Sequence, residues 1–75
     1  MKELVEYVAK SLVEDPSEVK VEVFEETRMV LLRLTVAPDD TGRVIGRDGR
    51  VAQALRSLLR SMASKTGKRV TLKIS

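Results

Sequence analysis

Apolar side chains recur between residues 2 and 14 with the three- and four-residue spacing of an amphipathic helix. Pro16 is expected to end this helix, because proline fits poorly beyond the first helical turn. The polar side of the helix is mostly acidic, and an anionic bilayer would repel it. The apolar stripe is therefore assigned to core packing rather than to a membrane surface.

Two strands are expected next, because apolar and polar side chains alternate in residues 19–24 and again in residues 29–37. In the first segment Val19, Val21 and Val23 are expected to face the core, and Phe24 breaks the phase and marks the strand's end. In the second segment the inward positions are Val30, Leu32, Leu34 and Val36. Only residues 25–28 separate the segments, so an antiparallel hairpin is predicted.

The second half of the chain reads as two helices and a strand. The strand is expected to end near Pro38, and a helix is expected to begin directly after it. Asp39 or Asp40 is the candidate N-cap of that helix. A short helix over residues 41–45 and a longer helix over residues 50–64 are expected, followed by Gly67 as a C-terminal cap. Alternation over residues 70–74 predicts a last strand, so the predicted order is α-β-β-α-α-β.

The helix predicted over residues 50–64 carries an apolar arc wider than a single core contact needs. Its main stripe is formed by Val51, Ala54, Leu55, Leu58 and Met62. Ala52, Leu59 and Ala63 widen the arc on one flank. Leu59 and Ala63 are expected to lie beyond the area that the sheet covers, which favours self-association or a partner contact.

Composition excludes most catalytic classes and indicates one small domain over residues 1–75. The chain has no Cys and no His, so a Ser-His-Asp triad, a Cys-His pair and a zinc site are all excluded. Neither a P-loop nor a metal-binding cluster occurs, and no metal, cofactor or enzymatic activity is expected. The longest apolar run, Met29–Leu32, has four residues, so no membrane span is expected and the predicted location is the cytoplasm.

The net charge of +3 conceals a strong asymmetry between the halves of the chain. Residues 1–41 contain ten acidic and five basic side chains, whereas residues 42–75 contain one acidic and nine basic side chains. The formal charges are therefore −5 and +8. A basic half on an otherwise acidic domain is typical of a protein that binds a polyanion, although a solvated charged face gives the same pattern.

The most informative segment joins the two predicted helices through Gly46-Arg47-Asp48-Gly49. Glycine adopts positive φ without steric cost and lets another backbone approach closely. Gly49 stands at the start of a helix, where free N–H groups and the helix dipole favour an anion. Arg47 and Arg50 flank this point. A tight turn with two capping glycines is the structural alternative, but the surrounding basic half favours a phosphate backbone laid across the turn.

Val44-Ile45-Gly46-Arg47-Asp48-Gly49 resembles the VIGxxG signature of KH domains, whose Gly-X-X-Gly loop clamps about four nucleotides of single-stranded RNA. The predicted element order is similar to the type II, or prokaryotic, KH arrangement and covers the whole chain. The resemblance implies an α+β fold in which a three-stranded mixed sheet carries three helices on one face. The chain is also similar to the small bacterial proteins that consist of one KH domain. That likeness implies a cytoplasmic RNA chaperone or regulator, which pairs with itself or with a larger KH-containing protein.

The family's RNA-binding positions fall on one continuous segment and on the last strand. The resemblance implies contacts from Arg43, Val44, Ile45, Gly46, Arg47, Asp48, Gly49, Arg50, Val51 and, across the groove, Lys73. Two residues depart from the family's pattern. Ala52 replaces a large aliphatic residue, and Asp48 places a carboxylate beside the expected phosphate path.

Three other interpretations were weighed against the KH groove. An RNA-recognition motif needs aromatic side chains on its central strands, and Tyr7 and Phe24 are the only aromatic residues. A DNA-reading helix-turn-helix has base-reading candidates on the 50–64 helix, but the preceding helix is too short. A KH fold used for dimerisation, with only weak and non-specific nucleic-acid binding, is the remaining alternative. The glycine pair argues against it, because a scaffold has no need of Gly46 and Gly49 beside arginines.

Overall fold

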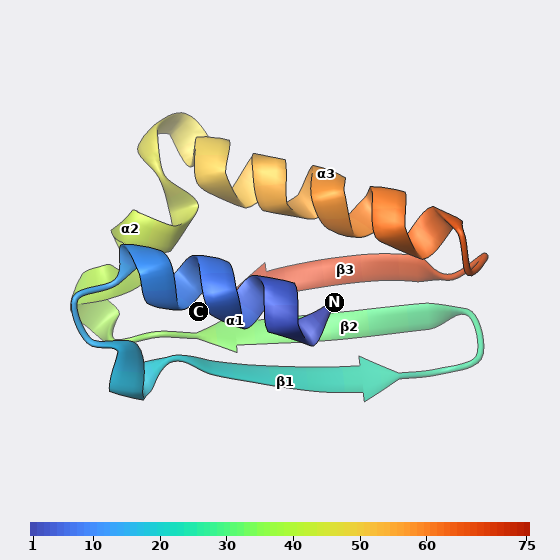
Figure 1. The fold of residues 1–75 in the computed structure, drawn as a ribbon, viewed down its shortest axis with the longest axis horizontal. Helices are drawn as coiled ribbons and strands as arrows, with labels where there is room; N and C mark the ends of the chain where they lie inside the picture. Colours follow the sequence, from blue (N-terminus) through green and yellow to red (C-terminus); the bar gives the residue numbers. More distant parts are fainter.

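A three-stranded sheet carries all the helices on one of its faces (Figure 1). The computed structural model describes residues 1–75. Its helices and strands are α1 (Lys2–Leu12), β1 (Lys20–Glu25), β2 (Met29–Thr35), α2 (Thr41–Ile45), α3 (Arg50–Ser64) and β3 (Arg69–Ile74). Short 3-10 turns precede β1, α2 and α3. None of the helices is both long and apolar enough to cross a lipid bilayer. The α+β class and the predicted element order are confirmed.

The central strand of the sheet is β2, which pairs antiparallel with β1 and parallel with β3. The predicted hairpin between β1 and β2 is present, and the Glu26 N–H closes it by donating to the Met29 carbonyl at 2.8 Å. A parallel pair cannot be joined by a tight turn and needs a crossover connection. The segment from α2 to α3 is that crossover, so the Gly46–Gly49 loop lies at one end of the helical layer (Figure 1).

The helix-facing side of β2 forms the centre of the hydrophobic core. Val30, Leu32, Leu34 and Val36 are all buried, as the alternation predicted. Val5 and Ala9 of α1 and Val44 of α2 pack in the same buried set. In register across the sheet, Leu32 lies beside Leu72 of β3. The core thus holds the α2–α3 crossover against the sheet.

The first helix and the first strand depart from their predicted bounds. α1 ends at Leu12, two residues before the predicted end, and β1 covers residues 20–25 rather than 19–24. Val23 lies on the helix side of β1 with Val21, as the alternation predicted, but it remains 41% exposed because the helices cover this edge of the sheet only in part. Phe24 does not end the strand. It continues the alternation onto the uncovered face, where the Arg33 guanidinium lies 5.4 Å from its ring centroid.

The apolar arc of α3 is oriented differently from the sequence-based expectation. Leu59 and Ala63 are each 1% exposed and belong to the core, so their assignment to an exposed flank is wrong. Leu58 is instead 53% exposed and Met62 is 43% exposed. Ala52 is also buried, which lets α3 pack closely without a large anchoring side chain. The sheet therefore contacts the flank of the arc, and part of the main stripe faces solvent.

Candidate nucleic-acid interface

The Gly46–Gly49 loop has a backbone that few residue types can adopt. Gly46, Asp48 and Gly49 have φ values of +80°, +57° and +74°. Asp48 makes no side-chain capping bond to α3. Aspartate is one of the few non-glycine residues that tolerate the left-handed region. An acidic residue at this position is therefore explained by backbone conformation.

The two glycines of the loop serve different structural purposes. A Cβ atom on Gly46 would lie 2.6 Å from Val51 Cγ2 and 2.9 Å from the Val51 backbone nitrogen. Gly46 is therefore needed for the close approach of α2 to α3. A Cβ atom on Gly49 would have no heavy atom within 4 Å. Gly49 thus leaves open space at the first turn of α3, where a ligand can reach the backbone.

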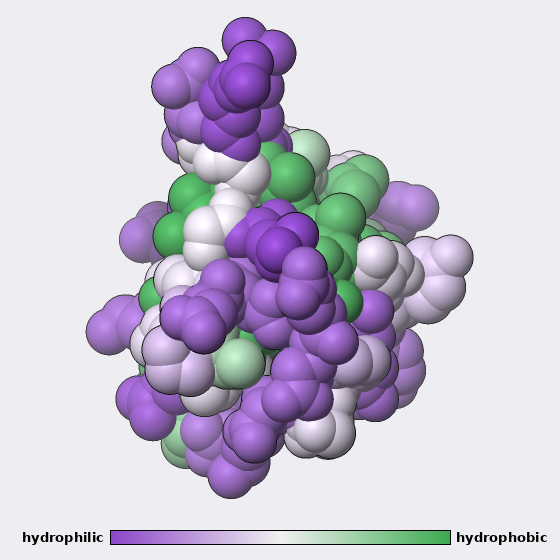
Figure 2. All heavy atoms as spheres, turned by 90° about the vertical axis from the view of Figure 1, so that its left-hand side faces the viewer, coloured by the Kyte–Doolittle hydropathy of each residue, from purple (hydrophilic) through white to green (hydrophobic).

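Positive charge gathers at this end of the molecule. Arg47 and Arg50 are exposed, and neither has a carboxylate within ion-pair distance. No side chain caps the N-terminus of α3, although the Gly49 and Arg50 N–H groups already donate to the Gly46 and Arg47 carbonyls in the preceding 3-10 turn. Seen from this end, the hydrophilic loop protrudes at the top, with apolar atoms beneath it on both sides (Figure 2). The arrangement suits an anionic group on the loop and less polar groups beside it.

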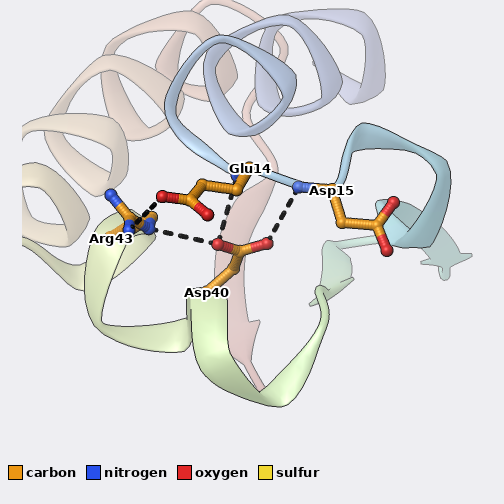
Figure 3. Close-up of polar contacts among 4 residues, drawn as sticks. All are labelled: Glu14, Asp15, Asp40 and Arg43. Carbon is orange, nitrogen blue, oxygen red and sulfur yellow. Dashed lines mark hydrogen bonds and ion pairs between the residues drawn. The ribbon is translucent and has the colours of Figure 1, made fainter.

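The buried carboxylate of Asp40 ties the start of α2 to the segment that follows α1 (Figure 3). Asp40 is 3% exposed. Its Oδ1 and Oδ2 accept hydrogen bonds from the backbone N–H groups of Glu14 at 3.1 Å and Asp15 at 3.2 Å. The Nε atom of Arg43 lies 3.2 Å from Oδ1. Asp40 occupies the N-cap position of α2 without a capping bond, so the prediction of its capping role is wrong.

A groove runs between α3 and the exposed edge of β3. It contains a hollow of about 130 Å³, lined by Leu59, Arg60 and residues 70–72 together with Arg56. The Arg56 guanidinium spans this groove and donates to the Leu72 carbonyl from Nε at 3.4 Å and Nη2 at 3.3 Å. Sequence reasoning did not include Arg56 among the site residues. The signal was present in the spacing, because residues 56 and 60 are one helical turn apart on α3.

The structure brings most of the predicted site residues together, but it places three of them elsewhere. Residues 45–51 form the loop and its two flanks. Val44 is 2% exposed and is a core residue, so its side chain is not part of the groove wall. Arg43 is turned away from the loop and pairs with Glu14 at 2.7 Å as well as with Asp40 (Figure 3). Lys73 lies beside Arg33 in register, on the sheet face opposite the helices.

Comparison with known proteins identifies relatives along nearly the whole chain. The family model described as "KhpA/KhpB, KH domain" matches residues 2–74. A protein of Clostridium acetobutylicum named RNA-binding protein KhpA is 46% identical over 74 residues, which cover 99% of each chain. A protein of the same name from Borreliella burgdorferi is 47% identical over 72 residues, covering 96% of this chain and 88% of the relative.

A third relative carries the same name. The RNA-binding protein KhpA of Aquifex aeolicus is 43% identical over 74 residues, covering 99% of this chain and 94% of its own. The match includes the short helix, the glycine loop and the long helix whose geometry is described above. The fold and the comparisons agree, and the chain belongs to the KhpA/KhpB family of KH domains.

Proposed function

We propose that this chain is an RNA-binding protein that holds a short single-stranded RNA segment around the Gly46–Gly49 loop. The observation that carries the proposal is the open backbone at Gly49, at the uncapped start of α3 and between two unpaired arginines. A phosphate at this point meets the positive end of the helix dipole and the guanidinium groups of Arg47 and Arg50. Bases then lie along the groove between α3 and β3.

We further propose that the protein acts as an RNA chaperone or regulator in the bacterial cytoplasm. The first support is the name RNA-binding protein KhpA, which its bacterial relatives carry. The second is the shape of the proposed site, which is a loop beside a shallow groove and not a deep pocket for a base. Crosslinking to RNA in cells, followed by sequencing of the bound RNA, tests this role. If the parent protein recovers no more RNA than a variant of the loop does, the proposed role is wrong.

The salt dependence of binding distinguishes the proposed clamp from a general basic surface. For single strands, log K changes by about −0.7 per unit of log salt for each neutralised phosphate. Contacts from Arg47, Arg50 and Arg56 give a slope of about −2, whereas all nine basic residues of the second half would give about −6. We expect Arg47→Ala to reduce the slope by about 0.7 with an RNA of about four nucleotides. Titrations in potassium chloride measure it.

The control for this titration is Lys20→Ala, which removes one exposed, unpaired charge on β1. Its slope with the short RNA is expected to equal that of the parent protein. If Arg47→Ala and Lys20→Ala reduce the salt slope by the same amount, the whole surface attracts RNA. The role proposed for the loop would then be wrong.

We also propose that the chain forms a homodimer through the apolar face between α1 and α3. Val8, Val51, Ala54, Leu55 and Leu58 line a hollow of about 270 Å³ on this face, with Arg50 at its edge. Leu58 and Met62 project beside it, each more than 40% exposed. A two-fold interface places the same patch on both copies. Projecting side chains next to a hollow make this patch complementary to itself.

We expect Leu58→Glu to yield monomers that remain folded, because Leu58 is 53% exposed. Leu59→Glu is the contrasting variant. It buries an unpaired charge in the core and is expected to destabilise the fold by several kcal/mol. Sedimentation equilibrium and a thermal melt on the same samples separate the two effects. A parent protein that stays monomeric at high concentration would exclude the homodimer and favour a larger KH-containing partner on this face.

A further inference from the structure

Two more hollows continue the α3–β3 groove away from the loop. The first has a volume of about 410 Å³ and shares Arg60 and Val70 with the hollow beside Arg56. The second has a volume of about 360 Å³ and shares Gly67 and Arg69 with the first. Arg28 of the β1–β2 hairpin lines its far side. The series therefore runs from the middle of α3 to the end of the sheet opposite the glycine loop.

Three arginines along these hollows carry charges that nothing in the chain neutralises. Arg28, Arg60 and Arg69 have no carboxylate within ion-pair distance. The Arg60 side chain contacts only Ser57 Oγ, which lies 3.3 Å from its Nη2. The backbone N–H of Arg69 donates to the Arg28 carbonyl at 2.9 Å and holds these two residues together.

Lys68, at the same end of the molecule, has a partner and is set apart from this group. Its Nζ lies 2.6 Å from Glu25 Oε2. The hydrogen bond from Lys68, assisted by its charge, lowers the pKa of the Glu25 carboxyl. Glu25 is therefore paired with Lys68 and with none of the three arginines, which stay available to an external anion.

We propose that an RNA strand longer than the loop clamp continues along the α3–β3 groove and places further phosphates on Arg60, Arg69 and Arg28. The inference rests on the proposed function, because the strand is positioned by the loop. Arg60 lies ten residues beyond Arg50, which is about 15 Å along the helix axis. Arg69 and Arg28 line the next hollows, toward the end of the sheet opposite the loop. A clamp for about four nucleotides does not span this whole series, so a longer strand is needed to connect the two ends.

The chemistry of this second site fits a phosphodiester backbone. Guanidinium groups bind phosphate oxygens in bidentate geometry. The hollows are open, and they are lined mainly by basic and small polar side chains rather than by aliphatic ones. Arg60 is therefore proposed to contribute to the binding of a long strand and not to the binding of about four nucleotides held at the loop.

A length series of unstructured RNA, titrated with potassium chloride, tests the proposal. With about four nucleotides, the double variant Arg60→Ala/Arg69→Ala is expected to match the parent. With about twelve nucleotides, the parent slope becomes steeper, and the double variant loses about 1.4 of it, equivalent to two phosphate contacts. Lys10→Ala/Lys20→Ala is the charge-matched control and is expected to leave both slopes unchanged. Thermal melts establish that all variants are folded.

Each failure has a distinct signature. Equal parent slopes for the short and long RNA would overturn the second site, as would equal losses in the double variant and its control. Two short strands bound per chain would mean a separate site rather than a continued strand. If the double variant no longer binds an acidic protein but has the same salt slope with the long RNA as the parent, the arginines bind that protein and not RNA. In all these cases the short RNA still depends on the loop, whereas failure of the proposed function would remove that dependence.

Discussion

Gly49→Asp is expected to lower the affinity for short single-stranded RNA at least tenfold while leaving the fold intact. The substitution adds a negative charge at the first turn of α3, where the phosphate is proposed to lie. A tenfold loss corresponds to about 1.4 kcal/mol, well within the effect of one repelled charge. A Cβ atom at this position meets no heavy atom within 4 Å. The φ of +74° strains any residue with a Cβ by about 1 to 2 kcal/mol, but aspartate enters the left-handed region more readily than most residues, and Asp48 adopts a φ of +57° in the same loop. Fluorescence anisotropy and a thermal melt measure the two quantities.

Gly49→Asn is the matched control, because asparagine has nearly the shape of aspartate and tolerates the same backbone conformation without a charge. It is expected to retain most of the affinity. If Gly49→Asp binds RNA as the parent does, the loop is not the phosphate site. If both variants lose affinity equally, the effect is steric and the electrostatic argument is wrong.

Gly46→Asp is expected to behave differently from Gly49→Asp, although the two glycines look equivalent in the sequence. Its Cβ atom would collide with the Val51 side chain and backbone. The variant is therefore expected to lose both RNA affinity and thermal stability, because α2 and α3 must move apart. The two glycines are therefore not interchangeable, because a side chain fits the available space at Gly49 and collides with α3 at Gly46.

Asp40→Ala is expected to destabilise the fold by about 2 to 4 kcal/mol. It leaves the N–H groups of Glu14 and Asp15 without their acceptor and removes one of the two partners of Arg43. For a domain of this size, such a loss lowers the melting temperature by roughly 10 °C or more. Urea denaturation and a thermal melt measure it.

Asp39→Ala is the control for this prediction, since Asp39 is exposed and adjacent in the chain. Its free energy of unfolding is expected to change by less than about 0.5 kcal/mol. Asp40→Asn keeps the shape but replaces one acceptor oxygen with a donor group, so an intermediate loss is expected. Equal stability of Asp39→Ala and Asp40→Ala would show that the buried carboxylate does not hold the start of α2.

Local patterns in the sequence were sufficient to predict the order of elements, the hairpin and the glycine loop. Alternation in β2 and helical spacing in α3 depend on backbone geometry alone. Both elements begin where predicted, but β2 ends at Thr35, two residues before the predicted end. The loop could be predicted because glycines at both ends of a short connection between two helices indicate a backbone with positive φ values. Its φ values of +80° and +74° are consistent with that reasoning.

Only the tertiary structure decided which side of each element meets a neighbour. The apolar arc of α3 is wider than the contact it makes, so spacing could not show that Leu59 is buried and Leu58 exposed. Asp40 was expected to cap the helix beside it, but its partners come from a segment more than twenty residues earlier. Arg56 likewise finds its acceptor on β3. These choices depend on long-range packing, because a side chain's environment is set by elements that only folding brings together.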